Sequence, residues 1–230
     1  MIDDPGTGSR RYLKSRETSW ARALAGWVAR TGITPNAISV LSLVFSVLAA
    51  VCLMKASDFP DKWTASAIWL GAALCIQLRL LCNLIDGMVA IEGGKKSAVG
   101  ALYNEMPDRL ADPLLMMAAG YCNDWVVKLC GIPVGWVAAV LSVLTAYIRV
   151  LGGTLTGTQS FIGPMAKQHR MAVLTAACLG SIVELWVRQD GKCAQEVMRW
   201  ALTLIVVGCA ITCWRRLSLI ANQLREPSKT

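Results

Sequence analysis

The sequence lacks the cysteine and histidine spacings that would indicate a disulfide framework or a zinc site. Its nine cysteines are scattered along the chain without a CxxC pair, and it has a single histidine. Several cysteines, including Cys52, Cys75 and Cys178, fall inside apolar runs, where a thiol behaves as a small hydrophobic side chain. We expect the lone His169 to be a loop residue rather than a catalyst.

The chain also lacks two features that would indicate other classes of protein. It contains no glycine-rich loop of the kind that cradles nucleotide phosphates in ATPases. It shows no internal repeat and no interrupted helices in matching positions, which are typical of secondary transporters. An ATPase and a transporter or channel are therefore both disfavoured.

Long uncharged runs dominate the sequence. Charged residues make up 17% of the chain and hydrophobic residues 55%. Ala37 to Met54 is a run of 18 residues without a charge, and Trp63 to Leu78 is a second uncharged run. Further apolar stretches cover residues 113–122, 132–148, 171–186 and 200–214. Since a helix needs roughly 20 apolar residues to cross a bilayer, these runs predict an all-α integral membrane bundle of about six transmembrane helices.

The basic residues are distributed asymmetrically between the two predicted sides of the membrane. With six spans and both termini on one side, 14 of the 23 lysines and arginines fall on that side, six on the other side, and three within helices. Positive charge concentrates on the cytoplasmic side of membrane proteins. We therefore interpret the net charge of +8 as a signal of cytoplasmic termini rather than of nucleic-acid binding.

Residues 18–30 form a separate pattern before the first span. Trp20, Leu24 and Trp27 recur at helical spacing, with Arg22 and Arg30 elsewhere on the helix surface. An amphipathic helix lying in the membrane interface would give this pattern, and so would an ordinary packed helix. We divide the chain into three parts: a cytoplasmic segment with the interfacial helix (1–32), a transmembrane domain (33–222) and a cytoplasmic tail (223–230).

Two polar stripes interrupt the second and third predicted spans. On the second span, four residues follow i, i+3, i+4, i+7 spacing and share one face: Asn83, Asp86, Gly87 and Ala90. On the third span, four residues recur every fourth position: Gly100, Asn104, Asp108 and Asp112. A short turn joins the two spans, so we expect them to be antiparallel neighbours whose stripes converge near the cytoplasmic boundary.

The oxygen-bearing side chains on these stripes point to a cation site. Ionisable groups at membrane depth are costly and tend to be functional. Carboxylate and amide oxygens suit a hard cation such as Mg²⁺. Gly87, Ala90 and Gly100 leave room for a bulky ligand to approach the helix backbone. The alternative is a helix–helix contact made of small residues and polar side chains.

At these residues the sequence resembles the CDP-alcohol phosphatidyltransferase family, whose signature is D-x2-D-G-x2-A-R-x8-G-x3-D-x3-D. Every spacing of the signature is matched without a gap, from Asn83 and Asp86 to Asn104 and Asp108. The segment Ile33-Thr34-Pro35-Asn36 is also similar to the family's N-terminal segment. The resemblance covers roughly residues 30–170.

The resemblance implies a metal-dependent transfer of a phosphatidyl (substituted phosphate) group from a CDP-activated lipid to an alcohol, with release of CMP, in phospholipid biosynthesis. It implies Mg²⁺ or Mn²⁺ as the metal and Asp108 as the general base. The implied metal ligands are Asn83, Asp86, Asn104 and Asp108, to which we add Asp112, one turn beyond Asp108. The implied nucleotide-binding residues are Asp86, Gly87, Ala90 and Gly100. It also implies a homodimer, and a multi-pass location in the cell (inner) membrane with a cytoplasmic active site.

The sequence departs from the signature at three positions. Asn83 and Asn104 stand where the family has aspartates, and Ile91 stands where it has arginine. An asparagine oxygen can ligate a metal but carries no charge, and Glu105 or Asp112 could restore some negative charge. These departures motivate an alternative function: a catalytically weakened or non-catalytic family member that binds nucleotide lipid or acts as a membrane partner protein.

Basic residues near the predicted inner side are candidates for binding a phosphate of the lipid or of the acceptor. Lys167 and Arg170 follow a glycine- and threonine-rich loop, and could equally be positive-inside anchors. Arg149 lies within the fourth predicted span, where an arginine needs a partner. We expect that partner to be the Asp86/Asp108 site or a diphosphate.

The charge asymmetry predicts that residues 92–97 face the cytoplasm. In intact cells, Lys95→Cys should resist a membrane-impermeant thiol reagent, whereas Asp58→Cys, on the predicted outer loop, should react readily. Measuring the labelled fraction of each variant tests the topology. Ready labelling of the cysteine at position 95 from outside would contradict it.

Overall fold

The computed structural model describes residues 18–56, 58–92, 100–122, 125–126, 128–129, 131–188 and 196–225. It contains seven helices in these residues: α1 (Ser19–Arg30), α2 (Pro35–Lys55), α3 (Lys62–Glu92), α4 (Gly100–Ala119), α5 (Val134–Thr156), α6 (Lys167–Val187) and α7 (Glu196–Arg225). Two small antiparallel ladders follow α4: β1 (Tyr121–Cys122) with β2 (Trp125–Val126), and β3 (Lys128–Leu129) with β4 (Ile132–Pro133). The predicted all-α membrane bundle is confirmed.

Five of the described helices are long and apolar enough to cross a membrane: α2, α3, α5, α6 and α7. The sequence predicted six spans, and the helix that does not qualify is α4, the predicted third span. Four charged residues lie within its 20 residues: Glu105, Asp108, Arg109 and Asp112. They lower its hydropathy below that of the other long helices, although α4 packs among them.

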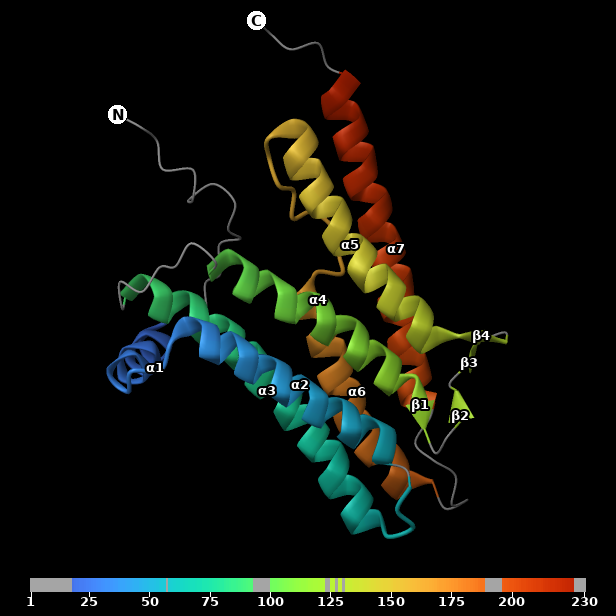
Figure 1. The fold of residues 1–230 in the computed structure, drawn as a ribbon. Coiled ribbons are helices and arrows are strands. Elements are labelled where there is room, and N and C mark those ends of the chain that lie inside the picture. Colours follow the sequence, from blue (N-terminus) through green and yellow to red (C-terminus); the bar gives the residue numbers. More distant parts are fainter. Residues whose placement is uncertain are drawn as a thin grey trace, which may run out of the picture.

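The long helices form a closed ring in the order α3, α2, α4, α5, α7 and α6. In Figure 1, α2 lies along α3 and α4, while α5 and α7 run side by side in the other half of the bundle. The predicted packing of α3 directly on α4 is wrong, because both pack mainly on α2 and touch each other only slightly. Their polar faces meet instead through long side chains.

Local sequence signals explain where the first two long helices begin. The hydroxyl of Thr34 accepts a hydrogen bond from the backbone N–H of Ala37 at 3.2 Å, and Pro35 occupies the first turn of α2. A carboxylate oxygen of Asp61 accepts a hydrogen bond from the N–H of Thr64 at 2.8 Å, which caps α3 in the same way. Both caps satisfy amide groups that the helix itself leaves unpaired.

α2 buries mainly small and polar residues, together with Ile38 and Leu53, and exposes most of its large apolar ones. The buried residues include Ser39, Ser42 and Ser46, and the exposed ones include Val40, Val44, Val47 and Val51. The hydroxyls of Ser42 and Ser46 donate to carbonyls one turn back, at 2.6 and 2.7 Å. In lipid, where apolar side chains gain nothing by turning inward, small residues let helices approach closely. This burial pattern therefore fits a helix surrounded by acyl chains.

α1 packs against the C-terminal half of α3. Ala21 and Ala25 are fully buried in one apolar cluster with Ile85 and Val89 of α3. Trp20 and Trp27 of α1 remain largely exposed, as do the tryptophans that membrane proteins place at the interface.

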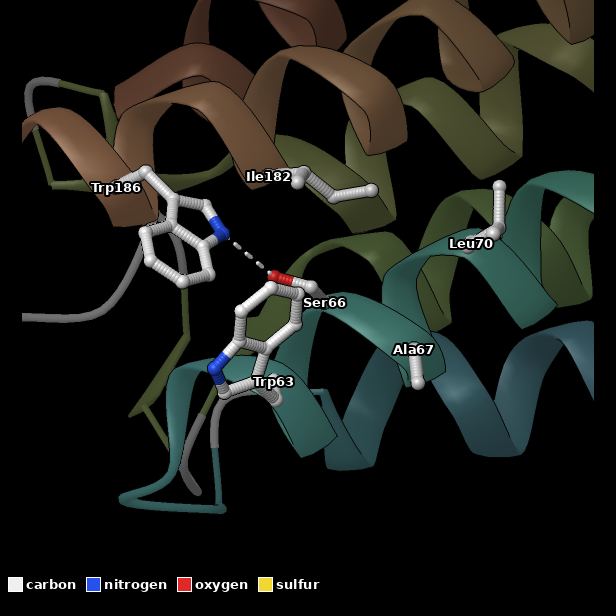
Figure 2. Close-up of a pocket in the computed structure, with 6 residues that line it drawn as sticks. All are labelled: Trp63, Ser66, Ala67, Leu70, Ile182 and Trp186. Atoms are coloured by element: carbon white, nitrogen blue, oxygen red, sulfur yellow. Dashed lines mark hydrogen bonds between the residues drawn. The ribbon is translucent and has the colours of Figure 1, made fainter.

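At the far end of α3 from the polar stripe, an aromatic contact joins α3 to α6. The rings of Trp63 and Trp186 meet edge to face with centroids 4.9 Å apart, and the indole N–H of Trp186 donates to the hydroxyl of Ser66 at 3.0 Å. Figure 2 shows these residues around an apolar groove that Ala67, Leu70 and Ile182 complete. The contact joins the C-terminal end of α6 to the N-terminal end of α3, and further along the same pair of helices Gln77 donates to the hydroxyl of Thr175 at 2.8 Å.

The closest approach of α4 to α5 depends on two glycines. A Cβ atom placed on Gly135 would lie 2.7 Å from the Cα of Gly120, and a Cβ on Gly120 would lie equally close to Gly135. Because backbone atoms cannot move aside as flexible side chains do, neither position has room for a methyl group. This contact fixes the end of the helix that carries Asp108 and Asp112.

Gly135→Ala should therefore destabilise the protein by about 1–3 kcal/mol, as overpacking of a close contact does. Gly26→Ala in α1 is the matched control, because a Cβ there meets no atom within 4 Å. The control should unfold at the same temperature as the wild type or slightly above it. Thermal unfolding of both variants in detergent tests this, and equal stability would show that α4 and α5 can separate at no cost.

Candidate functional site

Asp86 is the most isolated carboxylate of the predicted site. It projects from α3, is only 3% exposed, and accepts a hydrogen bond from the hydroxyl of Ser39 on α2 at 2.6 Å. Its other oxygen, Oδ1, is buried and has no hydrogen-bond partner among the described residues. A buried carboxylate oxygen without a donor is costly. It therefore suits a ligand that brings positive charge.

Asn83 connects the two polar stripes. Its amide nitrogen donates a hydrogen bond to Oδ1 of Asp108 at 3.0 Å, which links α3 to α4. The predicted convergence of the stripes is thus present, although α3 and α4 touch each other only slightly and both pack mainly on α2. The asparagine can make this bond because its amide donates, whereas an ionised aspartate only accepts.

Asp112 is held by two buried arginines. Arg79 of α3 donates to Oδ1 of Asp112 at 2.5 Å, and Arg170 of α6 donates to Oδ2 at 2.5 Å. Arg79 is fully buried and also approaches Oδ1 of Asp108 at 3.3 Å. Both oxygens of Asp112 are therefore engaged by guanidinium groups. Asp112 is therefore poorly suited to hold a metal ion.

Asp108 lies at the centre of the cluster, with a side chain that is 19% exposed. Lys167, at the start of α6, forms an ion pair with its Oδ2. Oδ1 receives the hydrogen bond from Asn83 and the guanidinium of Arg79. Asp108 thus joins residues of α3, α4 and α6 around one carboxylate.

The sequence analysis gave no role to Arg79, although a signal was present. Arg79 stands four residues before Asn83 and therefore lies on the same helix face as the motif. Its importance depends on Asp112 and Arg170, which are distant in sequence.

The Asp86/Asp108 site, one of the two partners predicted for Arg149, is wrong, whereas a diphosphate partner stays a prediction. The guanidinium of Arg149 pairs with Glu105 of α4, at 3.0 and 3.1 Å from the two carboxylate oxygens, and lies 5.5 Å from the centre of the Phe161 ring. Glu105 also pairs with Arg109. Glu105 therefore links α4 to α5 beside the site, rather than adding charge to it.

The other predicted residues are placed as follows. Gly87 is buried, whereas Ala90 and Gly100 are partly exposed. The side chain of Asn104 and all of residues 93–99 lie outside the described part of the structure. Nδ1 of His169 lies 2.6 Å from the carbonyl oxygen of Pro164, and no described contact joins it to the carboxylates.

A divalent cation fits this centre at Asp86. In the described part of the chain, no three His, Cys, Asp or Glu side chains group together as a metal site would require. The unpartnered oxygen of Asp86 is nevertheless a hard ligand. The side-chain amide oxygen of Asn83, one turn earlier on α3, is a second candidate metal ligand.

The chain matches a protein family over most of its length. The family model for CDP-alcohol phosphatidyltransferase covers residues 32–214. The inner membrane protein YnbA of Escherichia coli is 24% identical over 70% of this chain and 74% of its own length. A phosphatidylinositol phosphate synthase of Streptomyces avermitilis is 21% identical over 94% of this chain and 84% of its own.

Solved structures share the fold. Phosphatidylinositol phosphate synthase of Mycobacterium tuberculosis with CDP-DAG bound superposes with a TM-score of 0.67, at 19% identity, over 88% of this chain and 94% of that one. The same enzyme in complex with manganese and citrate also gives a TM-score of 0.67, at 19% identity, over 87% of this chain and 88% of that one.

The ion pairs of Asp112 predict a large difference between two Asp→Asn variants. Asp112→Asn removes the charge between Arg79 and Arg170, and breaking a buried pair in this way costs about 3–5 kcal/mol. Asp58→Asn removes one partner of an ion pair whose lysine is 57% exposed, and should cost less than about 1 kcal/mol. Unfolding by titrated SDS in mixed micelles compares them. Similar losses would show that the buried cluster does not stabilise the fold.

Proposed function

Because the chain belongs to the CDP-alcohol phosphatidyltransferase family, we propose that it transfers the phosphatidyl group of a CDP-diacylglycerol-type lipid to an alcohol, with release of CMP, in a reaction that needs Mg²⁺ or Mn²⁺. One observation carries the proposal more than any other. The hydrogen bond from Asn83 to Asp108 brings the two halves of the motif together beside the unpartnered carboxylate oxygen of Asp86.

Asp86 and Asn83 would hold the metal. When bound, a divalent ion at this position neutralises charge on the diphosphate of the donor as CMP departs. The Mycobacterium tuberculosis enzyme shares this fold and has been solved with manganese and with CDP-DAG. This supports a divalent metal and a CDP-lipid donor for the present protein. We assign Asn104 to the same centre on the spacing of the motif alone.

Asp108 would serve as the general base. The oxygen of the acceptor alcohol forms a bond to the phosphorus of the phosphatidyl group, the bond from that phosphorus to the CMP oxygen breaks, and Asp108 takes the hydroxyl proton. Asp108 is suited to this role because its side chain is partly exposed, whereas that of Asp112 is buried between two arginines.

The remaining residues would bind and position the substrates. Gly87, Ala90 and Gly100 present little bulk where the cytidine of the donor would lie. Lys167 and Arg149 are 26% and 20% exposed and could contact phosphate oxygens of the donor or acceptor. Arg170 would act through Asp112, because its guanidinium already donates to Asp112, Thr145 and the carbonyl of Met165.

We place the site on the cytoplasmic side of the inner membrane, with both termini on that side. The charge asymmetry of the sequence supports this orientation. We also propose a homodimer, on the family resemblance alone. Cross-linking in native membranes, which should yield a species of twice the monomer mass, tests it.

The decisive experiment is incubation of the purified protein with CDP-diacylglycerol, Mg²⁺ or Mn²⁺, and a panel of alcohols. Metal-dependent CMP release with one of the alcohols is the expected result. Binding of CDP-diacylglycerol without CMP release for any alcohol would instead favour a non-catalytic member of the family.

Asp108→Asn should lower the rate of CMP release by about 10²–10⁴-fold, since a general base contributes that much. The variant keeps the shape and one oxygen of the side chain but loses the proton acceptor. It should still elute as a monodisperse species in detergent. Asp58→Asn, far from the site on the outer loop, should retain full activity. Near-normal turnover by Asp108→Asn would remove Asp108 from the mechanism.

A further inference from the structure

Among the described residues, the charged side chains that meet at the site are equal in number for the two signs. Three are acidic and three are basic: Asp86, Asp108, Asp112, Arg79, Lys167 and Arg170. Five of the six are joined by ion pairs. Within the described residues, no salt bridge reaches Asp86, which is 3% exposed and has one oxygen without a partner.

We propose that this centre binds a single divalent cation, at Asp86, and that the ammonium group of Lys167 supplies the second positive charge, at Asp108. The inference rests on the proposed function and deepens it. It assigns a positioning role to Lys167 and explains why residue 83 is an asparagine. The family resemblance gives a set of ligands, and the present inference adds how many ions they hold.

The contacts of Asp108 support this assignment. Oδ2 is paired with Lys167, and Oδ1 receives both the amide of Asn83 and the guanidinium of Arg79. A divalent ion at Asp108 would have to displace the lysine and would then lie beside its positive charge. At such a short distance, repulsion between a divalent ion and an ammonium group is costly.

The balance of charges around Asp108 also explains why residue 83 is an asparagine. An asparagine can donate its N–H to Asp108, as the structure shows. An aspartate there would place a second carboxylate against Asp108, an arrangement that needs further positive charge. Asn83 and Lys167 therefore act together: the amide adds no negative charge, and the ammonium balances the charge that is present.

The test counts bound Mn²⁺ in the purified full-length protein, from the loss of the free-ion signal in electron paramagnetic resonance. The wild type should bind one ion, and Asp86→Asn should bind none. Asn83→Asp combined with Lys167→Met adds one negative charge and removes one positive charge, which together match one divalent ion. This double variant should bind two ions, and Mn²⁺ should raise its unfolding temperature more than that of the wild type.

Lys167→Arg is the matched control, because it keeps the positive charge and should still bind one ion. The double variant guards against misfolding as an explanation, since a damaged site does not gain an ion. A wild type that binds two ions or none, retention of the ion by Asp86→Asn, or a single ion in the double variant would each overturn the proposal. CMP release is measured separately, so an active enzyme with two ions would overturn this inference and leave the proposed function standing.

Discussion

The buried ion pairs of Asp112 are the contacts on which the rest of the site depends. One carboxylate receives a guanidinium from α3 and another from α6, and it is itself carried by α4. These three helices are not consecutive neighbours in the ring, because α2 separates α3 from α4. The two arginines thus connect helices across the interior, where an uncompensated charge would be expensive. Asp108 lies one turn away on the same face of α4 and inherits its position from this connection.

Charge inside this bundle is arranged as a continuous network rather than as separate pairs. Arg79 reaches both Asp108 and Asp112, while Lys167 and Arg170 approach the same two carboxylates from the first turn of α6. A side chain that serves two partners loses its rotational freedom only once. Such sharing makes a polar interior less costly, and it also means that the residues of the site do not act independently.

The sequence was sufficient to place the motif residues on the correct helix faces, because i, i+3, i+4 spacing depends only on helix geometry. It was not sufficient to order the helices. The position of α2 between α3 and α4 depends on buried serines and alanines such as Ser42 and Ala49, whose small size does not stand out in an apolar run. The partner of Arg149 was also out of reach, because Glu105 lies 44 residues earlier on another helix. The exclusion of α4 from the spans could have been anticipated from its four charges.

The packing of α1 on α3 brings α1 close to the stretch of α3 that carries Asp86. Ala25 and Val89 belong to one apolar cluster, and Val89 is less than one turn from Asp86. Trp20 and Trp27 of α1 are expected to lie at the level of the lipid headgroups, which would place Asp86 at nearly the same level. A donor whose phosphates are kept at headgroup depth by its acyl chains meets the carboxylate by lateral diffusion, without leaving the bilayer. The enzyme and its lipid donor would then meet by diffusion in two dimensions. A water-soluble substrate would still have to reach the site from solution, by diffusion in three dimensions.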